Sequence, residues 1–504
     1  MPAYLKNPTT KIILIFIFAF AIRLAGIASR PIWYDEAFSI LFSEKGLSAM
    51  LYGTLSQTAA GSADIHPLGY YTILWAWINI FGRSILAARL FSVLVNLLSL
   101  GLVYQIAKDL FNEKTAITAA LLFSILPFQV HFAQEIRMYS LLSFWLLLAT
   151  YSFLCGRIGN WKWWIVFATS SVLAQYTHNL AAFYLIPLAI TPVFQRDLKT
   201  LRNLTVAGFG AIVLYLPWLI HLPAQLSKVS ASYWVERPGI EKIFTLVLFY
   251  LPHLPLPAKL LLPGLMVSMI TITLAIFQTT LARKKKLQTV NRGVWLAYLA
   301  FMPALLLWLV SQFVPIYIER ALLPSHAIFC IWLAWAFTET EIPKPVQIFG
   351  FGLIIIAAMA GIFQHITYKG FPYGPFLELN RTIHAELQQG DVIVHSNKLS
   401  YLPAFYFDPK TPQGYIADSK GGATDTLAPA TQEILQIQAY DDLQTATKDK
   451  NRIWFIIYQQ SIDEFTSQGY KTHPQLEYLN NNFTLTSTKV FDDIRLYIYT
   501  RKSP

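Results

Sequence analysis

Charged residues and cysteines are scarce in this chain. Of its 504 residues, 13% are charged and 55% are hydrophobic, whereas soluble domains carry about 25% charged residues. The two cysteines, Cys155 and Cys330, both lie in or beside apolar stretches, which excludes a disulfide framework and a cysteine-based metal site. The sequence also has no glycine-rich phosphate loop, internal repeat or low-complexity stretch. Its composition indicates a polytopic membrane protein.

Long hydrophobic runs are what the chain has in excess. Roughly 20 apolar residues in a helix span a bilayer, and about eleven stretches approach or reach that length. They are 12–28, 86–107, 115–132, 139–155, 163–177, 180–194, 204–221, 256–280, 294–313, 321–338 and 346–364. The first run lacks a small-residue cleavage site, so we expect it to be retained. The shorter runs 68–82 and 243–252 are ambiguous.

Basic residues indicate how these spans are oriented. The net charge is +11, but the lysines and arginines gather in short loops between apolar runs, as topology signals do, so we expect no nucleic-acid partner. If 68–82 does not cross, all these loops fall on the cytoplasmic side, with Arg283–Lys286 as the strongest anchor. We therefore predict that 68–82 is an interfacial or re-entrant helix. The alternative is that it crosses and a second span compensates.

Hydropathy falls sharply after about residue 365. We predict a transmembrane domain over 1–365 and a soluble α/β domain over 366–504 that lies outside the cytoplasm. Strands are expected at 391–394, 404–407, 452–458 and 494–500, with helices at 375–389 and 429–448.

Four polar clusters emerge at the predicted outer ends of the spans. They are Trp33–Glu36, Asp64–Tyr71, His131–Tyr139 and Tyr176–Asn179. Adjacent carboxylates such as Asp35 and Glu36 are costly beside a lipid-soluble helix, unless something there loses a proton or meets a cation. Any one cluster could be a solvated helix end, and Glu135 with Arg137 could form a surface pair worth less than about 1 kcal/mol.

Together, the clusters suit transfer of a group from a lipid phosphate. A carboxylate can take the proton of an acceptor hydroxyl, and an arginine fork can hold the phosphate. The same carboxylates could instead bind a hard divalent cation.

Five motifs follow one another in a specific order. They are Arg23-Leu24, Trp33-x-Asp35-Glu36-Ala37-x-Ser39, His66-Pro67-Leu68-x-Tyr70-Tyr71, Gln134-Glu135-x-Arg137-Met138-Tyr139 and Glu319-Arg320-Ala321-Leu322-Leu323-Pro324. This set resembles the bacterial branch of the protein O-mannosyltransferase-like membrane glycosyltransferases, in the GT-C superfamily. The lipid A aminoarabinose transferases are more distant relatives. The resemblance covers roughly residues 12–365.

The resemblance implies an inverting transfer of a sugar from a polyprenyl-phosphate donor to a lipid, glycan or protein hydroxyl. The reaction would take place on the extracytoplasmic side of a bacterial inner membrane. It makes Asp35 the catalytic base, with Glu36 and Glu135 as further acidic residues. The expected substrate-binding residues are Tyr34, His66, Tyr70, Arg137, Tyr139, His178, Asn179 and Arg320. The resemblance is also compatible with a Mg or Mn ion held by Asp35 and Glu135, because members of the superfamily differ in whether they need a metal.

Two features depart from the resemblance. Many relatives have His-Pro-Pro where this chain has His66-Pro67-Leu68. Residues 366–504 lie outside the shared core, and we expect them to recruit acceptor or donor.

The main alternative function is a multi-spanning lipid or sugar transporter or flippase, and a non-catalytic scaffold for envelope assembly is a third. Transporters usually carry ionisable residues near the bilayer midplane. The polar groups of this chain lie at span ends, which favours the transferase.

Overall fold

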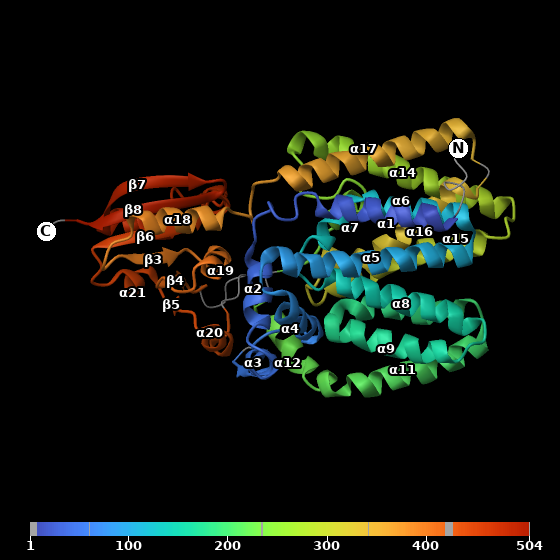
Figure 1. The fold of residues 1–504 in the computed structure, drawn as a ribbon, viewed down its shortest axis with the longest axis horizontal. Coiled ribbons are helices and arrows are strands. Elements are labelled where there is room, and N and C mark those ends of the chain that lie inside the picture. The colour runs from blue at the N-terminus through green and yellow to red at the C-terminus, as the bar shows by residue number, and fades with distance from the viewer. Residues whose placement is uncertain (1–7, 60, 233–234, 341, 419–426, 503–504) are drawn as a thin grey trace.

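The computed structural model describes residues 8–59, 61–232, 235–340, 342–418 and 427–502 (Figure 1). A helical bundle is followed by a sheet with flanking helices. The bundle contains α1 (Pro8–Leu24), α5 (Ile85–Leu110), α6 (Glu113–Ile125), α7 (Pro127–Ala133), α8 (Tyr139–Arg157), α9 (Lys162–Thr177), α10 (Ala182–Phe194), α11 (Leu198–Leu219), α14 (Ala258–Lys284), α15 (Val290–Ser311), α16 (Leu323–Thr338) and α17 (Lys344–Thr367). Each apolar stretch predicted as a span coincides with one or two of these helices.

The number of candidate spans is smaller than predicted. Six helices in the described part of the chain are long and apolar enough to cross a membrane, or eight if two bent helix pairs each count as one span. One pair is α6 and α7, which meet at 60° because Pro127 begins α7 and cannot continue the hydrogen bonding of α6. The prediction of about eleven is too high by this measure, since α1, α9 and α10 have only 17, 16 and 13 residues.

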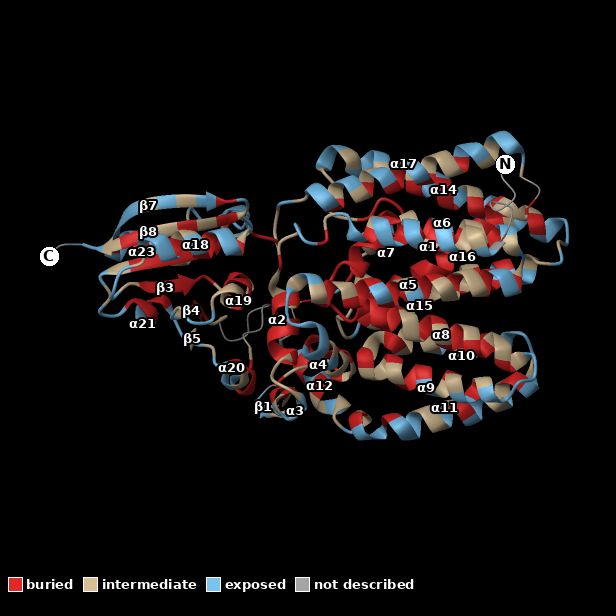
Figure 2. Cartoon of the chain, viewed as in Figure 1, coloured by how far each residue is buried: buried red, intermediate tan, exposed pale blue. Residues whose placement is uncertain are grey.

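Burial follows the expected pattern of a bundle in lipid (Figure 2). Every residue from Leu323 to Phe337 of α16 is buried, so this helix forms the centre of the bundle. The outer helices α11, α14 and α17 instead expose large apolar side chains such as Phe209, Phe277 and Phe363. An apolar surface of this extent is stable in a bilayer and not in water. The chain is an integral membrane protein.

Short helices collect at the end of the bundle that faces the sheet, which we call the domain end (Figure 1). They are α2 (Tyr34–Ser43), α3 (Leu47–Leu55), α4 (Gly69–Phe81), α12 (Leu222–Ser232) and α13 (Glu241–Tyr250). Helix α4 is the predicted interfacial helix, and its 13 residues are too few for a crossing. A two-stranded hairpin, β1 (Gln57–Thr58) and β2 (Gly61–Ser62), connects α3 to the segment before α4. The opposite end of the bundle is called the distal end.

The C-terminal part folds around a mixed six-stranded sheet in the order β5-β4-β3-β6-β8-β7. Its strands are β3 (Val392–His395), β4 (Gln413–Ile416), β5 (Ala439–Tyr440), β6 (Arg452–Tyr458), β7 (Phe483–Phe491) and β8 (Ile494–Arg501), and its helices are α18 (Phe376–Glu386), α19 (Lys398–Phe407), α20 (Pro429–Leu435), α21 (Leu443–Thr447), α22 (Gln459–Ser467) and α23 (Pro474–Asn482). The first four strands in this order pair in parallel and the last two antiparallel. The predicted α/β character is confirmed.

Two of the predicted elements in this part are wrong. Residues 404–407 belong to α19 and not to a strand, because the Asn397 side chain accepts a hydrogen bond from the amide of Leu399 and starts a helix there. The single helix predicted over 429–448 is interrupted. Gln436 adopts a left-handed conformation with φ 56° that ends α20, and β5 precedes α21.

The C-terminal part is docked against the domain end of the bundle. Helix α19 packs on α2, and α20 packs on α3. The hydroxyl of Tyr406 donates to the carbonyl of Arg83 at 2.9 Å, and that of Thr431 donates to the carbonyl of Gly53 at 3.2 Å. The helix that carries Asp35 is therefore covered by the C-terminal part.

Candidate active site

Helix α2 sends the two adjacent carboxylates in different directions. Consecutive helical residues point roughly 100° apart. Glu36 turns inward, where its two oxygens accept from Nε and Nη2 of Arg89 at 3.0 and 2.7 Å and Oε1 also accepts from the amide of Ile136. Both side chains are buried, and Arg89 donates further to three backbone carbonyls just before α2. Glu36 therefore holds α2 in place and does not reach an open site.

Asp35 instead meets two arginines from distant parts of the chain. Its Oδ2 lies 3.1 Å from Nη1 of Arg320 and 3.4 Å from Nε of Arg137. Burial acts to raise the pKa of Asp35, but the two guanidiniums outweigh it and lower that pKa. Asp35 is thus a carboxylate at neutral pH, and 15% of its side chain remains exposed.

The two arginines differ in how firmly they are held. Arg137 is 4% exposed, and its Nη1 donates to the hydroxyls of Tyr71 at 3.3 Å and Ser39 at 3.4 Å. Arg320 is 19% exposed and lies 5.2 Å from the ring centre of Tyr139. Within the described residues, Nε of neither arginine makes a hydrogen bond. Two guanidiniums facing one carboxylate leave excess positive charge, which an anion would neutralise.

Glu135 supplies a second acidic group with different properties. Its side chain is 2% exposed, and Oε2 has no hydrogen-bond partner within the described residues. Burial raises the pKa of Glu135 to about 7, although Arg320 and Arg30 act in the opposite direction. At neutral pH this carboxyl can therefore donate or accept a proton.

The two predicted histidines lie next to each other, and one of them lies next to Tyr139. The rings of His66 and His178 meet edge to face at 5.8 Å, and His178 lies 6.0 Å from the ring of Tyr139. His66 is held by Asp64, 2.8 Å from its Nδ1. Burial lowers the pKa of His178, and its Nε2 has no partner among the described residues. A neutral imidazole with a free nitrogen can bind a hydroxyl group.

The structure does not bring every predicted residue to the site. Asn179 uses its amide to hold neighbouring segments, donating to the carbonyl of Ile65 at 3.1 Å and accepting from Tyr215 at 2.8 Å. Tyr70 is fully buried against Phe91 and Tyr71. Tyr34 is half-buried next to Asp35, at the contact with the C-terminal part.

Comparison with known proteins identifies the class of molecule that carries this site. Residues 65–221 match the family described as dolichyl-phosphate-mannose-protein mannosyltransferase. ArnT from Cupriavidus metallidurans in the apo state superposes with a TM-score of 0.64 at 12% identity, covering 97% of this chain and 98% of that one. This chain is a membrane glycosyltransferase of the GT-C type. The predicted enzyme class is confirmed, and the transporter alternative is not.

Two further structures share the fold of this glycosyltransferase. ArnT bound to undecaprenyl phosphate gives a TM-score of 0.61 at 12% identity, with 97% of both chains covered. The oligosaccharyltransferase of Archaeoglobus fulgidus in complex with Zn and sulfate gives 0.54 at 11% identity, covering 96% of this chain and 73% of that one. No curated protein matches the sequence. Because ArnT is covered over nearly its whole length, the sheet belongs to the shared fold, contrary to the expectation for 366–504.

Sequence reasoning missed two residues that shape the site of this enzyme. Arg89 lies inside the apolar run 86–107, and a charge within a span should have indicated a buried partner. Lys398 begins α19, and its Nζ lies 5.7 Å from the ring centre of Tyr34. No local pattern could reveal Lys398, because its place beside α2 depends on how the C-terminal part docks.

A divalent cation fits the site poorly. No cluster of three or more histidine, cysteine, aspartate or glutamate side chains suited to a metal occurs in the described part of the enzyme. Asp35 is already held by Arg137 and Arg320, whose charges would repel a Mg or Mn ion. The metal pair predicted at Asp35 and Glu135 stays a prediction.

Proposed function

We propose that this enzyme transfers a sugar, with inversion, from a polyprenyl-phosphate donor to the hydroxyl of an acceptor, and that Asp35 is the general base. The carrying observation is the Asp35 carboxylate held between Arg137 and Arg320. The donor class is supported by the structures of similar fold that were solved with undecaprenyl phosphate and with a dolichol-phosphate. The acceptor is a lipid, a glycan or a protein.

The reaction follows from the charges in the site. Asp35 takes the proton of the acceptor hydroxyl, and the acceptor oxygen forms a bond to the anomeric carbon on the face opposite the phosphate. The bond between that carbon and the phosphate oxygen breaks, and the electron pair leaves with the polyprenyl phosphate. The guanidinium of Arg320 neutralises the charge that develops on this leaving group.

Donor binding also explains how a strongly paired carboxylate can act as a base. Asp35 between two arginines is a weak base, because both guanidiniums lower its pKa. Arg320 is the more exposed of the two arginines, at 19% against 4% for Arg137. When a donor phosphate draws Arg320 away, the pKa of Asp35 rises towards its usual range. Arg137, held by Tyr71 and Ser39, keeps Asp35 in position.

The domain end is proposed to face away from the cytoplasm. The basic loops of the distal end, including Arg283–Lys286, resist translocation. A bacterial inner membrane with the site and the C-terminal part on its outer side fits this asymmetry. Lys398 beside Tyr34 gives the C-terminal part a place at the entrance of the site, where it recruits acceptor or donor.

Replacement of Asp35 by asparagine tests the proposal. Asparagine keeps the shape but cannot take a proton, so transfer by the purified enzyme should fall about 10²–10⁴-fold. The assay offers a panel of polyprenyl-phosphate sugars with and without EDTA, and we expect EDTA to have no effect. Glu44→Gln is the matched control, because Glu44 also lies on the domain end but pairs with the exposed Arg83. A wild-type rate for Asp35→Asn would refute the role of Asp35.

A further inference from the structure

Arg23, from the first of the five sequence motifs, lies outside the active site. It is fully buried near the end of α1, and within the described residues its guanidinium bonds only neutral groups. One of these, the carbonyl of Ala19, belongs to α1 itself. A charged side chain buried among membrane helices is costly and usually serves function. The other partners of Arg23 indicate what this function is.

The first partners lie at the bend between α6 and α7. In an unbroken helix the carbonyl of Phe123 would accept from the amide of residue 127, but Pro127 has no N–H. Nη2 of Arg23 donates to this carbonyl, and Nη1 donates to the carbonyl of Ser124, both at 3.2 Å. The guanidinium also offsets the negative end of the α6 dipole. Arg23 therefore supplies hydrogen bonds that the 60° bend removes.

Arg23 is also tied to α7 through α5. Nε of Arg23 donates to Oδ1 of Asn96 at 2.7 Å, and Nδ2 of Asn96 donates to Oε1 of Gln129 on α7 at 3.1 Å. Nε2 of Gln129 in turn donates to the carbonyl of Leu323 at the start of α16. This chain of hydrogen bonds fixes the start of α7 to the centre of the bundle.

The far end of α7 is held by the backbone around Arg23. Gln134 follows the last residue of α7, and its Nε2 donates to the carbonyls of Arg23 and Ala25 at 2.8 Å each. Glu135 follows directly in the chain, and Arg137 comes two residues later. Both ends of α7 are thus bound to Arg23, and the second end leads into the active site.

We propose that Arg23 is a positioning residue for sugar transfer: it fixes where Glu135 and Arg137 stand in the active site. Helix α7 has only 7 residues, so a change in its tilt at the bend moves its far end. Nε of Arg137 lies 3.4 Å from Oδ2 of Asp35, and a displacement of about 1 Å in an active site can lower a rate about 10²-fold. The proposal rests on the proposed role of Asp35 as the base.

Two variants of Arg23 test this role in the purified full-length enzyme in detergent. The probe is the polyprenyl-phosphate sugar of the panel that the wild type transfers. Arg23→Met removes every donor, so kcat should fall about 10²-fold, while KM for the donor, which Arg320 binds, should change less than about twofold. Arg23→Lys keeps the charge but has no planar fork to bond Asn96 and α6 together, so kcat should fall about tenfold.

A double variant separates positioning from stability. Arg23→Met leaves the carbonyl of Phe123 without a partner, which lowers the thermal unfolding midpoint. Adding Pro127→Ala supplies an amide to that carbonyl and should restore part of the lost midpoint. Since the bend is then no longer held, kcat should stay low. A role in stability alone predicts instead that kcat recovers with the midpoint.

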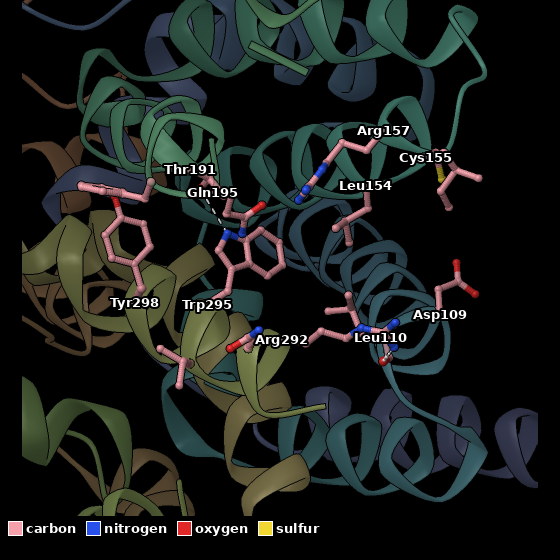
Figure 3. A pocket seen from close by; sticks show the side chains of 14 residues that line it. Asp109, Leu110, Leu154, Cys155, Arg157, Thr191, Gln195, Arg292, Trp295 and Tyr298 are labelled. Carbon is pink, nitrogen blue, oxygen red and sulfur yellow. Dashed lines mark hydrogen bonds between the residues drawn. The ribbon is translucent and has the colours of Figure 1, made fainter. Parts of the chain in front are cut away.

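The matched control removes a buried hydrogen bond far from the active site. Trp295 donates to Thr191 at 3.1 Å beside a cavity of about 850 Å³ at the distal end (Figure 3). Helix α8 runs from Tyr139 at the active site to Leu154 at this cavity, roughly 20 Å at 1.5 Å per residue. Thr191→Val should lower the thermal midpoint, because the Trp295 N–H loses its acceptor, and should leave kcat as in the wild type.

Three results would overturn the proposal: a wild-type kcat in either Arg23 variant, recovery of kcat in the double variant, or an equal fall of kcat in Thr191→Val. Asp35→Asn is measured in the same assay. A wild-type rate for Asp35→Asn would refute the proposed function. An inactive Asp35→Asn together with a wild-type kcat in either Arg23 variant would refute only the role of Arg23.

Discussion

Replacing Glu135 by glutamine should abolish a loss of stability that the enzyme suffers as the pH rises to neutrality. The Glu135 side chain is 2% exposed, and burial raises its pKa from 4.5 to about 7. The folded enzyme therefore binds this proton more tightly than the unfolded chain does. The resulting stabilisation is complete below about pH 4.5 and is lost as the pH rises through about 7.

The size of the effect follows from the same values. A rise in pKa from 4.5 to about 7 corresponds to roughly 3 kcal/mol of unfolding free energy. Glutamine has the shape of the neutral carboxyl and does not titrate, so the variant should gain up to this amount over the wild type above pH 7. The pKa of about 7 already includes the attraction of Arg320 and Arg30 for the Glu135 anion, so this gain needs no further correction for their loss.

The measurement is the thermal unfolding midpoint of the purified enzyme in detergent between pH 5 and 8.5. The wild-type midpoint should fall relative to that of Glu135→Gln across this range, and the transfer rate of the wild type should change near pH 7. Glu44→Gln, which removes a carboxylate paired with exposed Arg83, controls for the lost negative charge. If the wild-type and Glu135→Gln midpoints run parallel over the whole range, Glu135 does not titrate near pH 7 and the reasoning is refuted.

Three further predictions concern the arginine pair, the buried ion pair and the topology. Arg137→Lys keeps the charge but loses the fork that holds the catalytic base, so transfer should fall about tenfold; a rate that is unchanged while thermal stability drops would make the residue structural. Glu36→Gln leaves Arg89 buried without a counter-charge and should cost about 3–5 kcal/mol of stability, which a second change, Arg89→Met, should partly restore. A cysteine at exposed Ser467 should react with an impermeant thiol reagent in intact cells, and one at Gln288 only after permeabilisation; the reverse pattern would place the active site in the cytoplasm.

The helices of the bundle could be predicted because each one corresponds to a long run of apolar residues in the sequence. By length and composition fewer helices of the described chain qualify as spans than this rule predicted, since α9 and α10 are apolar but only 16 and 13 residues long. That Asp35, Arg137 and Arg320 lie at the same end of the bundle followed from one further constraint, whereas their contact with one another was not predicted. If the basic loops share one side, the polar loops must share the other.

The sheet was predicted only where a strand has a clear pattern of apolar residues, as in β3, β6 and β8. Strands β6 and β8 contain continuous or alternating apolar residues, whereas β5 has two residues and β7 buries only its end residues, Phe483 and Phe491. Short and edge strands depend on pairing with distant neighbours such as β4 and β8. The residues of β5 and β7 do not themselves indicate which strand each one pairs with.

The different roles of Asp35 and Glu36 could not be predicted from the sequence. Both carboxylates suit a base, and only the direction of each side chain decides between them. Arg89 is fully buried, and an unpaired charge there would be prohibitive, so one carboxylate must meet it. Because Glu36 does so from one side of α2, Asp35 is turned towards Arg137 and Arg320. A one-residue change in the register of α2 would take Glu36 away from Arg89 and Asp35 away from the two arginines, and the buried Glu36–Arg89 pair opposes it.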